Sequence, residues 1–415
     1  MFDKDGGFVF ELKWSFGGVY MQSIEVKRMP EYDVIVVGGG VAGVAAAVAS
    51  ARNGAKTLLM EKTVMLGGLA TAGLISWYEP LCDGEGNQMI HGIAEELIRL
   101  SVKYGLENLP AKWGGLGKSP IHYDRYATRF SPGIFALALI EYFEENGVSL
   151  RFDTLATYPD VEYGICKGIL VETVGGREYF PAKMFIDATG DACVCHRAGV
   201  PTELGENYLS YITHDILYKD VENLAETRDF CSARRWRSVG SDLFGNGHPK
   251  GKSKVQVTSA DDVTDYMVWG GKKILERLKG EEKESRDVMT IPTMPQFRKI
   301  RRIIGEYELD GSEEGMTFDD SVGTFGDFRK AGRHFQLPYT TLYNKCVSNL
   351  YAAGRVISSK NDGWELTRVI PVAALSGEAA GTAAALCVRN QCGNYELDVK
   401  MLQSVLKEAG VKIQY

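Results

Sequence analysis

The hydrophobic positions change their spacing near residue 38, and this change predicts a strand followed by a helix. Residues 34–37 are a β-branched apolar run, which is typical of a buried strand. Residues 44–53 are small and apolar with the spacing of a helix, and residues 56–60 form a second apolar strand. Residues 34–51 carry no charge and are long enough to span a bilayer, but the change of period splits them into two elements. We therefore expect no membrane span.

Similar patterns predict further elements along the chain. Helical spacing predicts amphipathic helices over residues 90–105 and from Pro132 onward, where Ser131 is placed to cap the helix. Short apolar runs predict strands, which cover residues 149–152, 165–173, 178–180, 183–186 and 350–353. Near the end, Pro371 opens a long helix of small residues that ends near Arg389, and residues 397–410 form an amphipathic helix.

Composition and periodicity divide the chain into two parts. Residues 31–204 and 345–415 share the regular α/β pattern, whereas residues 205–344 carry more charge, more aromatics and weaker periodicity. We therefore predict an α/β fold, in which a discontinuous Rossmann-like domain (31–204 and 345–415) has a parallel sheet flanked by helices plus a small antiparallel sheet. An α+β substrate or cap domain would be inserted at 205–344, with residues 295–309 as an arginine-lined strand or helix–strand unit. Residues 1–30 form an N-terminal extension in which residues 8–20 alternate partly, as in a hairpin, and Met21 is an alternative start.

A glycine motif lies at the junction of the first strand and helix. Gly38, Gly40 and Gly43 fit the pattern G-x-G-x-x-G, and Glu61 follows the second strand. In a strand–turn–helix unit these glycines permit the tight turn, the approach of a pyrophosphate to the backbone, and close helix packing. The helix N-terminus attracts phosphates, and the acid can accept hydrogen bonds from a ribose. The complete arrangement is a strong indication of a dinucleotide-binding site.

The net charge and the cysteine content limit the kinds of partner and metal site that we expect. The net charge of −7 makes nucleic acid an improbable partner. The eight cysteines contain no C-x-x-C pair, so we expect neither an iron–sulfur cluster nor a zinc site, and no metal. The first residues include acids, whereas a signal peptide begins with a basic region, so we expect no signal peptide. We therefore expect a cytoplasmic protein whose cysteines are free thiols.

Three separated stretches agree on one family resemblance. They are VVGGGVAGVAAAVASARNGAKTLLMEK with the following GG, FIDATGDA, and NLYAAGRVI with RVIPVAALSGEAAGTAAAL. Together they resemble the FAD-dependent oxidoreductases of the glutathione-reductase-like Rossmann class. Within that class the chain resembles a broad bacterial family distantly akin to fumarate reductase and succinate dehydrogenase flavoproteins and to the flavoprotein component of heterodisulfide reductase. GGLATAGLIS, GIAEEL and RKIRRIIGEYEL strengthen the narrower match.

The resemblance implies a flavoprotein enzyme that binds FAD non-covalently. The helix that begins at Pro371 would direct its N-terminus at flavin N1 and the C2 carbonyl, where its dipole favours the negative charge of reduced flavin. One departure is Thr340, which stands where the family often has an arginine. The implied FAD-binding residues are Gly38, Gly40, Val41, Ala42, Gly43, Glu61, Lys62, Gly67, Gly68, Thr71, Ala188, Thr189, Gly190, Asp191, Gly354, Arg355 and Pro371.

The catalytic residues and the reaction are less narrowly defined. Arg368, just before the flavin-facing helix, is the first candidate, and His334 with Arg333 is the second. Other polar candidates are His122, Tyr123, Arg125, Arg129, His214 and Tyr339, while Arg298, Arg301 and Arg302 fit a site or an exposed basic strand face equally well. We expect hydride transfer between flavin N5 and a small organic substrate, with a separate electron donor or acceptor. The alternatives are an electron-transfer subunit that works with a partner redox protein and, third, a flavoprotein that binds nucleic acid.

Overall fold

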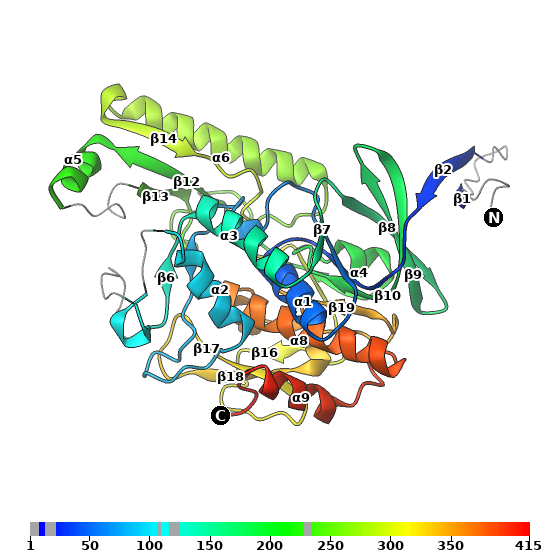
Figure 1. Ribbon diagram of the computed structural model, residues 1–415. Coiled ribbons are helices and arrows are strands. Elements are labelled where there is room, and N and C mark those ends of the chain that lie inside the picture. The colour runs from blue at the N-terminus through cyan, green and yellow to red at the C-terminus, as the bar shows by residue number, and fades with distance from the viewer. Residues whose placement is uncertain (1–7, 13–21, 106–108, 116–124, 228–233) are drawn as a thin grey trace.

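The computed structural model describes residues 8–12, 22–105, 109–115, 125–227 and 234–415. In this part of the chain a mixed nine-stranded sheet forms the centre of the molecule, with helices packed against it (Figure 1). Its parallel strands follow the order β19–β10–β3–β4–β7. Their bounds are Leu350–Ala352 for β19, Gly176–Asp187 for β10, Tyr32–Val37 for β3, Thr57–Met60 for β4 and Ser149–Arg151 for β7.

The predicted α/β architecture is confirmed, including the small antiparallel part. Strand β9 (Ile165–Thr173) pairs antiparallel with β10, and β8 (Leu155–Glu162) pairs antiparallel with β9. The remaining strands form smaller sheets and are β5 (Trp77–Tyr78), β6 (Thr128–Arg129), β11 (Thr202–Leu204), β12 (Ser210–Leu217), β13 (Arg234–Gly240), β14 (Arg286–Thr290), β15 (Arg301–Ile303), β16 (Leu309–Asp310), β17 (Ser321–Gly326), β18 (His334–Pro338) and β20 (Ser359–Lys360).

One long strand, β10, replaces the two strands predicted at residues 178–180 and 183–186. Up to Pro181 it pairs antiparallel with β9, and from Ala182 onward it pairs parallel with β3. Proline cannot donate to a ladder, and Pro181 lies at the point where the strand changes partner. The apparent break in the sequence pattern is therefore a change of neighbours within one strand.

The N-terminal extension joins the central sheet. Strands β1 (Phe8–Leu12) and β2 (Gln22–Arg28) pair antiparallel, and β2 also pairs with β10. The partner of β1 thus lies beyond residues 8–20, where the hairpin was predicted. Residues 13–21 lie outside the described part.

The predicted helices are all found, with ends that shift by a few residues. Those expected at residues 44–53, 90–105, from 132, 371–389 and 397–410 are α1, α2, α3, α8 and α9. Ser131 occupies the N-cap position of α3, but its side chain makes no capping hydrogen bond. The helix bounds are α1 Val41–Arg52, α2 Ile93–Val102, α3 Pro132–Glu145, α4 Cys193–Arg197, α5 Tyr218–Thr227, α6 Ala260–Gly280, α7 Asp362–Thr367, α8 Ile370–Asn390 and α9 Val399–Glu408.

Helices α1 and α8 pack together unusually closely because α8 carries glycines at the contact. A Cβ on Gly377 would come within 2.2 Å of the Ala42 carbonyl oxygen, and one on Gly381 within 2.1 Å of the Ala46 oxygen. Any larger side chain would force the two helices apart. Helix α8 is long and apolar enough to cross a membrane, but its apolar stretch is entirely buried inside the protein. The small residues of α8 therefore serve helix packing.

A second, smaller hydrophobic core lies beside the sheet. The sheet of β12, β13 and β14 and the long helix α6 extend from one side of the molecule (Figure 1). Their core consists of Leu209, Tyr211, Val257, Tyr266, Ile274 and Phe297. Ile303 and Val322 belong instead to the main core. The division at residues 205–344 stays a prediction, and we propose that the inserted unit ends near residue 300.

The arginine-lined stretch 295–309 differs from its prediction. Only its short segments β15 and β16 are strands, and no helix is present within it. Arg302 is 1% exposed and bonds to Glu203 at 2.6 Å and to Glu308 at 2.5 Å. These two carboxylates compensate its charge in the interior. The stretch is therefore not an exposed basic strand face.

Candidate active site

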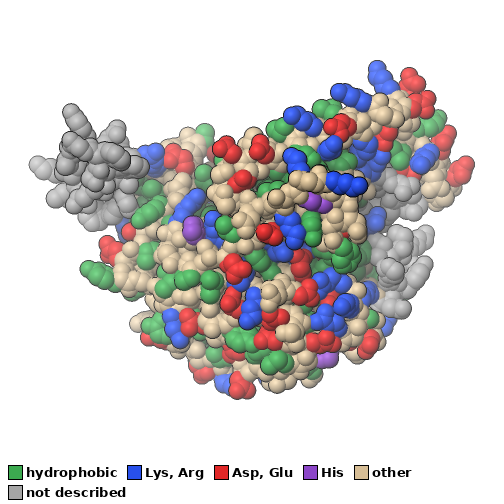
Figure 2. All heavy atoms as spheres, turned by 180° about the vertical axis from the view of Figure 1, so that it is seen from behind, with side chains coloured by type: hydrophobic (Ala, Val, Ile, Leu, Met, Phe, Trp, Pro, Cys, Tyr) green, Lys and Arg blue, Asp and Glu red, His purple; other side chains and the backbone are tan. Residues whose placement is uncertain are grey.

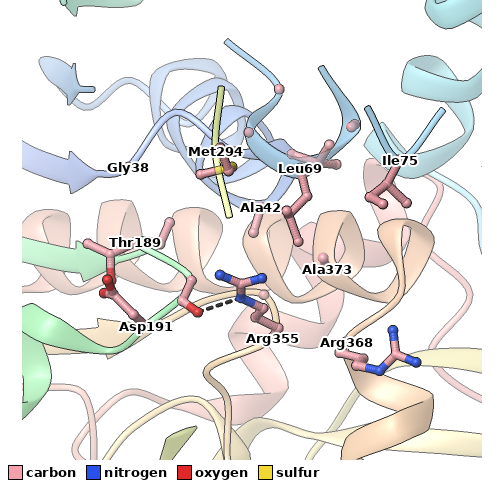
Figure 3. Close-up of a pocket in the computed structure, with 18 of the residues that line it drawn as sticks. Gly38, Ala42, Leu69, Ile75, Thr189, Asp191, Met294, Arg355, Arg368 and Ala373 are labelled. Carbon is pink, nitrogen blue, oxygen red and sulfur yellow. Dashed lines mark hydrogen bonds between the residues drawn. The ribbon is translucent and has the colours of Figure 1, made fainter. Parts of the chain in front are cut away.

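The parallel strands end at one level, and a cavity opens there. Val37 lies opposite both Met60 and Asp187, and Asp187 lies opposite Ala352. The segments that follow these four residues therefore leave the sheet along the same edge, as expected for parallel strands. A cavity of about 430 Å³ lies at this edge, and Figure 3 shows part of its lining.

The first glycine turn forms one wall of the cavity. Gly38 has φ of +105°, which favours glycine, and a Cβ on Gly43 would lie 1.8 Å from the Gly38 carbonyl oxygen. Gly43 therefore packs the helix against the turn and does not line the cavity. A Cβ on Gly40, by contrast, would meet nothing within 4 Å. The space beside Gly40, at the N-terminus of α1, is open to a ligand.

Glu61 is fixed at the cavity wall by two backbone N–H groups and one hydroxyl group. The Gly39 N–H donates to its Oε2 at 2.6 Å, and the Thr63 N–H and hydroxyl donate to Oε1 at 2.8 Å each. These bonds leave capacity on the carboxylate for a further donor such as a ribose hydroxyl. Lys62 lines the cavity beside it.

The second glycine loop contributes two of its three predicted residues. Gly67 and Gly68 line the cavity, and the Gly67 N–H donates to the Gly39 carbonyl oxygen at 2.8 Å, which ties this loop to the first. Thr71 does not line the cavity. Its hydroxyl donates to the Leu66 carbonyl oxygen at 2.5 Å, so it stabilises the loop from inside.

The segment after β10 brings Ala188, Thr189, Gly190 and Asp191 to the cavity, together with Gly354 and Arg355 from the end of β19. Figure 3 shows Arg355 near the middle of the cavity, with Thr189 and Asp191 on one side and Arg368 on the other. Its Nε donates to the Gly190 carbonyl oxygen and its Nη1 to the Phe297 oxygen at 2.5 Å. Burial lowers the pKa of Arg355 to about 10.

The N-terminus of α8 forms the other end of the cavity. Val369, Ile370 and Ala373 line it, whereas Pro371 is buried and does not. Arg368 also lines it and forms an ion pair with Glu365 at 2.7 Å. Although burial acts against it, Arg368 and Lys299 lower the pKa of Glu365 to about 2.

Glu79 is a cavity residue that the sequence analysis missed. Its side chain lines the same end, is 9% exposed, and accepts a hydrogen bond from the Ile370 N–H at 3.3 Å. Burial raises the pKa of Glu79 to about 7, although Arg368 and the Ile370 N–H act against this. The signal in the sequence was weak: a single acid before a proline in an apolar stretch.

The inserted segment supplies a largely apolar wall. Gln296 holds this wall against the second glycine loop, because its Nε2 donates to the Gly73 carbonyl oxygen at 2.7 Å and its Oε1 accepts from the Ile212 N–H at 2.8 Å. Arg298 is the charged residue of this wall. The apolar lining residues of this wall are Ile212, Trp236, Leu243, Met294 and Phe297, and Phe328, which packs against the main core, also lines the cavity.

The structure does not bring Arg333 and His334 to the cavity. Arg333 pairs with Asp327 at 2.8 Å and Glu314 at 2.6 Å, and the His334 ring packs edge-on against Tyr415. These partners were not evident from the sequence. They engage Arg333 in ion pairs and His334 in ring packing away from the cavity. Their predicted catalytic role gains no support from this geometry.

The weaker candidates are dispersed. His122 and Tyr123 lie outside the described residues. Arg125 donates to the Phe328 carbonyl oxygen at 2.5 Å, and buried His214 contacts the Ser76 hydroxyl at 3.2 Å. Among the described residues, no group of three or more His, Cys, Asp or Glu side chains is arranged to hold a metal ion.

A family model described as FAD dependent oxidoreductase matches residues 33–254 and 248–406, which is nearly the whole chain. The chain belongs to the FAD dependent oxidoreductase family. The protein is therefore a flavoprotein enzyme with FAD as its cofactor. The described residues fit this cofactor, because the open space beside Gly40, the anchored Glu61 and the N-termini of α1 and α8 share one cavity, and the N-cap residues of both helices make no side-chain capping bond.

Individual relatives are more distant. The tRNA uridine 5-carboxymethylaminomethyl modification enzyme MnmG of Lactobacillus johnsonii is 33% identical in an alignment of 174 residues, which covers 39% of this chain and 24% of that enzyme. The match thus spans about a quarter of the relative's length. A geranylgeranyl bacteriochlorophyll reductase-like protein of Thermoplasma acidophilum is 15% identical with a TM-score of 0.50, covering 91% of this chain and 83% of that chain. This second similarity shows the fold.

A third relative, also a solved structure, has a lower structural similarity to this chain. The p-nitrophenol 4-monooxygenase of Pseudomonas putida is 13% identical with a TM-score of 0.45, covering 92% of this chain and 82% of that chain. These values say nothing about the substrate of the present protein.

Proposed function

We propose that the enzyme transfers a hydride between flavin N5 and a small organic substrate bound in the cavity at the sheet edge. One observation carries this proposal: a single cavity joins the cofactor-type edge of the sheet to the apolar wall of the inserted segment. A substrate on that wall would be enclosed with the cofactor and shielded from water.

The protein's contribution to cofactor binding can be assigned to particular groups. The N–H groups of Val41 and Ala42, in the first turn of α1, would hold the pyrophosphate beside Gly40, and Glu61 would hold the adenosine ribose. The N-terminus of α8 would face the flavin, and its dipole would favour negative charge there. FAD supplies the two-electron chemistry when bound.

Two side chains at the α8 end would handle charge and protons. Arg368 places a guanidinium at this end of the cavity, where it favours negative charge. Glu79 has a pKa of about 7, so it can take up or release a proton near neutral pH. We propose that Glu79 exchanges the proton that accompanies hydride transfer. Its burial keeps this exchange away from bulk water.

Nucleic acid modification, which is the activity named for MnmG, is not our proposal for this chain. The match covers only 24% of that enzyme, and the net charge here is −7. Figure 2 shows acidic and basic side chains interspersed over the face opposite that of Figure 1. Such a mixed surface is unlike the basic footprint typical of nucleic-acid binding. The electron-transfer alternative is also not favoured by any feature of the cavity.

The electron source provides a test of the proposed function. The sequence has one G-x-G-x-x-G unit with its strand, helix and acid, and it lacks the second, mid-chain unit that NAD(P)H-using relatives of this class carry. In anaerobic stopped flow, NADH and NADPH should bleach the flavin only slowly and without saturation. A panel of alcohols, amines and organic acids, tested with the oxidised enzyme, should contain compounds that bleach it with saturation.

Two outcomes would contradict the proposal. Fast, saturable reduction by NADH or NADPH at micromolar concentration would show a nicotinamide site within the inserted segment. Flavin that resists every small molecule but is reduced or oxidised by a partner redox protein would favour the electron-transfer alternative.

A further inference from the structure

Four arginines line the cavity, and they differ in how their charge is compensated. Arg197 donates to the Ala156 carbonyl oxygen at 3.1 Å. The other three are Arg298, Arg355 and Arg368. Arg368 is paired with Glu365, which also binds Lys299 at 2.8 Å. Among the described residues, Arg355 donates to the carbonyl oxygens of Gly190 and Phe297, and the charge of Asp191 acts on it. Within the described part of the chain, the Arg298 guanidinium has no hydrogen bond or ion pair.

An unpaired guanidinium in a cavity is costly, because arginine remains protonated and cannot neutralise itself. Burial, and after it the charge of Arg368, lowers the pKa of Arg298. The two guanidiniums are thus close enough to repel each other. Arg298, Arg368 and Lys299 carry three positive charges, whereas Glu365 and Asp242 carry two negative charges. Burial raises the pKa of Glu79 to about 7, so while Glu79 is protonated positive charge remains in excess. An anion placed between Arg298 and Arg368 would compensate the cost of burying these guanidiniums and would reduce the repulsion between them.

The pyrophosphate of FAD is a poor match for this excess charge. The space suited to its pyrophosphate lies beside Gly40 at the N-terminus of α1. Arg298 comes from the inserted wall, and its charged neighbours are Arg368 and Glu365 near α8 and Asp242 of the inserted segment. Arg355 lies near the middle of the cavity and is better placed for the cofactor (Figure 3).

We propose that Arg298, with Arg368 beside it, binds a carboxylate group of the substrate, whose carbon skeleton packs against the apolar wall of the inserted segment. This inference rests on the proposed function, since it assumes that the substrate shares the cavity with FAD. A planar guanidinium matches a carboxylate with two parallel hydrogen bonds. Ile212, Trp236 and Met294 offer an apolar surface for the rest of the molecule. The substrate class is therefore a small amphipathic organic acid.

The test compares acids with their uncharged counterparts on the FAD-loaded enzyme. Benzoate, phenylacetate and hexanoate are titrated against benzamide, phenylacetamide and hexanamide, with binding measured by calorimetry and by the flavin difference spectrum. Because charge-assisted hydrogen bonds are involved, at least one acid should bind roughly tenfold or more tightly than its amide. Arg298→Gln should abolish this preference, and Arg298→Lys should retain part of it.

Arg301→Gln is the matched control, because Arg301 lies three residues further along and outside the cavity lining. It should keep both the FAD content and the preference for acids. The proposal is overturned if no acid binds more tightly than its amide. It is also overturned if Arg298→Gln loses FAD while the remaining holoenzyme still prefers acids, since Arg298 would then serve the cofactor. A failure of the proposed function would appear separately, as acid binding that is equally strong without FAD and leaves the flavin spectrum unchanged.

Discussion

Replacing Gly40 with valine should abolish FAD binding and leave the protein folded. A Cβ at Gly40 meets no protein atom within 4 Å, so the new side chain would occupy only the space that we assign to the pyrophosphate. Loss of these phosphate contacts should weaken FAD binding by roughly 100-fold or more, about 2.8 kcal/mol. The measurements are FAD content after purification, fluorescence titration of the apoprotein with FAD, and circular dichroism.

Gly133→Val is a suitable control for this variant. Gly133 lies in the first turn of α3, and a Cβ there also meets nothing within 4 Å, but it is remote from the cavity lining. This control should bind FAD like the wild type. Full FAD occupancy in folded Gly40→Val would show that the cofactor lies elsewhere. Gly43→Ala would be uninformative, because its Cβ would collide with the Gly38 carbonyl oxygen and disturb the turn itself.

Arg368→Ala should lower the two-electron reduction potential of the bound FAD without lowering the FAD content. The guanidinium lies at the α8 end of the cavity, where its positive charge would stabilise the anionic reduced flavin. Removing one charge at an effective dielectric constant near 20 should lower the potential by on the order of 30–60 mV. The measurement is a spectroscopic redox titration. Turnover with any accepted substrate should also fall more than FAD occupancy.

Arg329→Ala controls for the loss of an ion pair with α7. Arg329 pairs with Asp362 of α7 at 2.7 Å, as Arg368 pairs with Glu365 of the same helix, but Arg329 does not line the cavity. Its potential should equal that of the wild type. Equal potentials for Arg368→Ala and Arg329→Ala would reduce Arg368 to a structural partner of Glu365.

The dinucleotide motif was predictable because its parts are local. Val34–Val37, the glycines after it and Glu61 follow one another within a single strand–turn–helix–strand unit, and each has a distinct requirement for residue type. Parallel pairing then places the ends of β3, β4, β10 and β19 at the same edge. Sequence alone thus indicated the cofactor and several residues that line the cavity.

The substrate end was less predictable, because it is assembled by tertiary packing. Glu79 becomes notable only when burial and the Ile370 N–H bring it to the start of α8. Arg333 attracted attention as an arginine beside a histidine, but Asp327 and Glu314 hold it away from the cavity. Charge compensation is a property of three-dimensional neighbours, and the sequence does not show it.

Hydrogen–deuterium exchange with and without FAD tests the central claim most directly. The claim is that FAD binds at the N-termini of both α1 and α8 in one cavity, and the first-turn amides of a helix have no intrahelical acceptor. Peptides covering residues 38–47 and 366–375 should both exchange more slowly once FAD is bound, whereas the first turn of α3 should not change. Protection of only one of the two peptides, or of neither in a protein that holds FAD, would contradict the account.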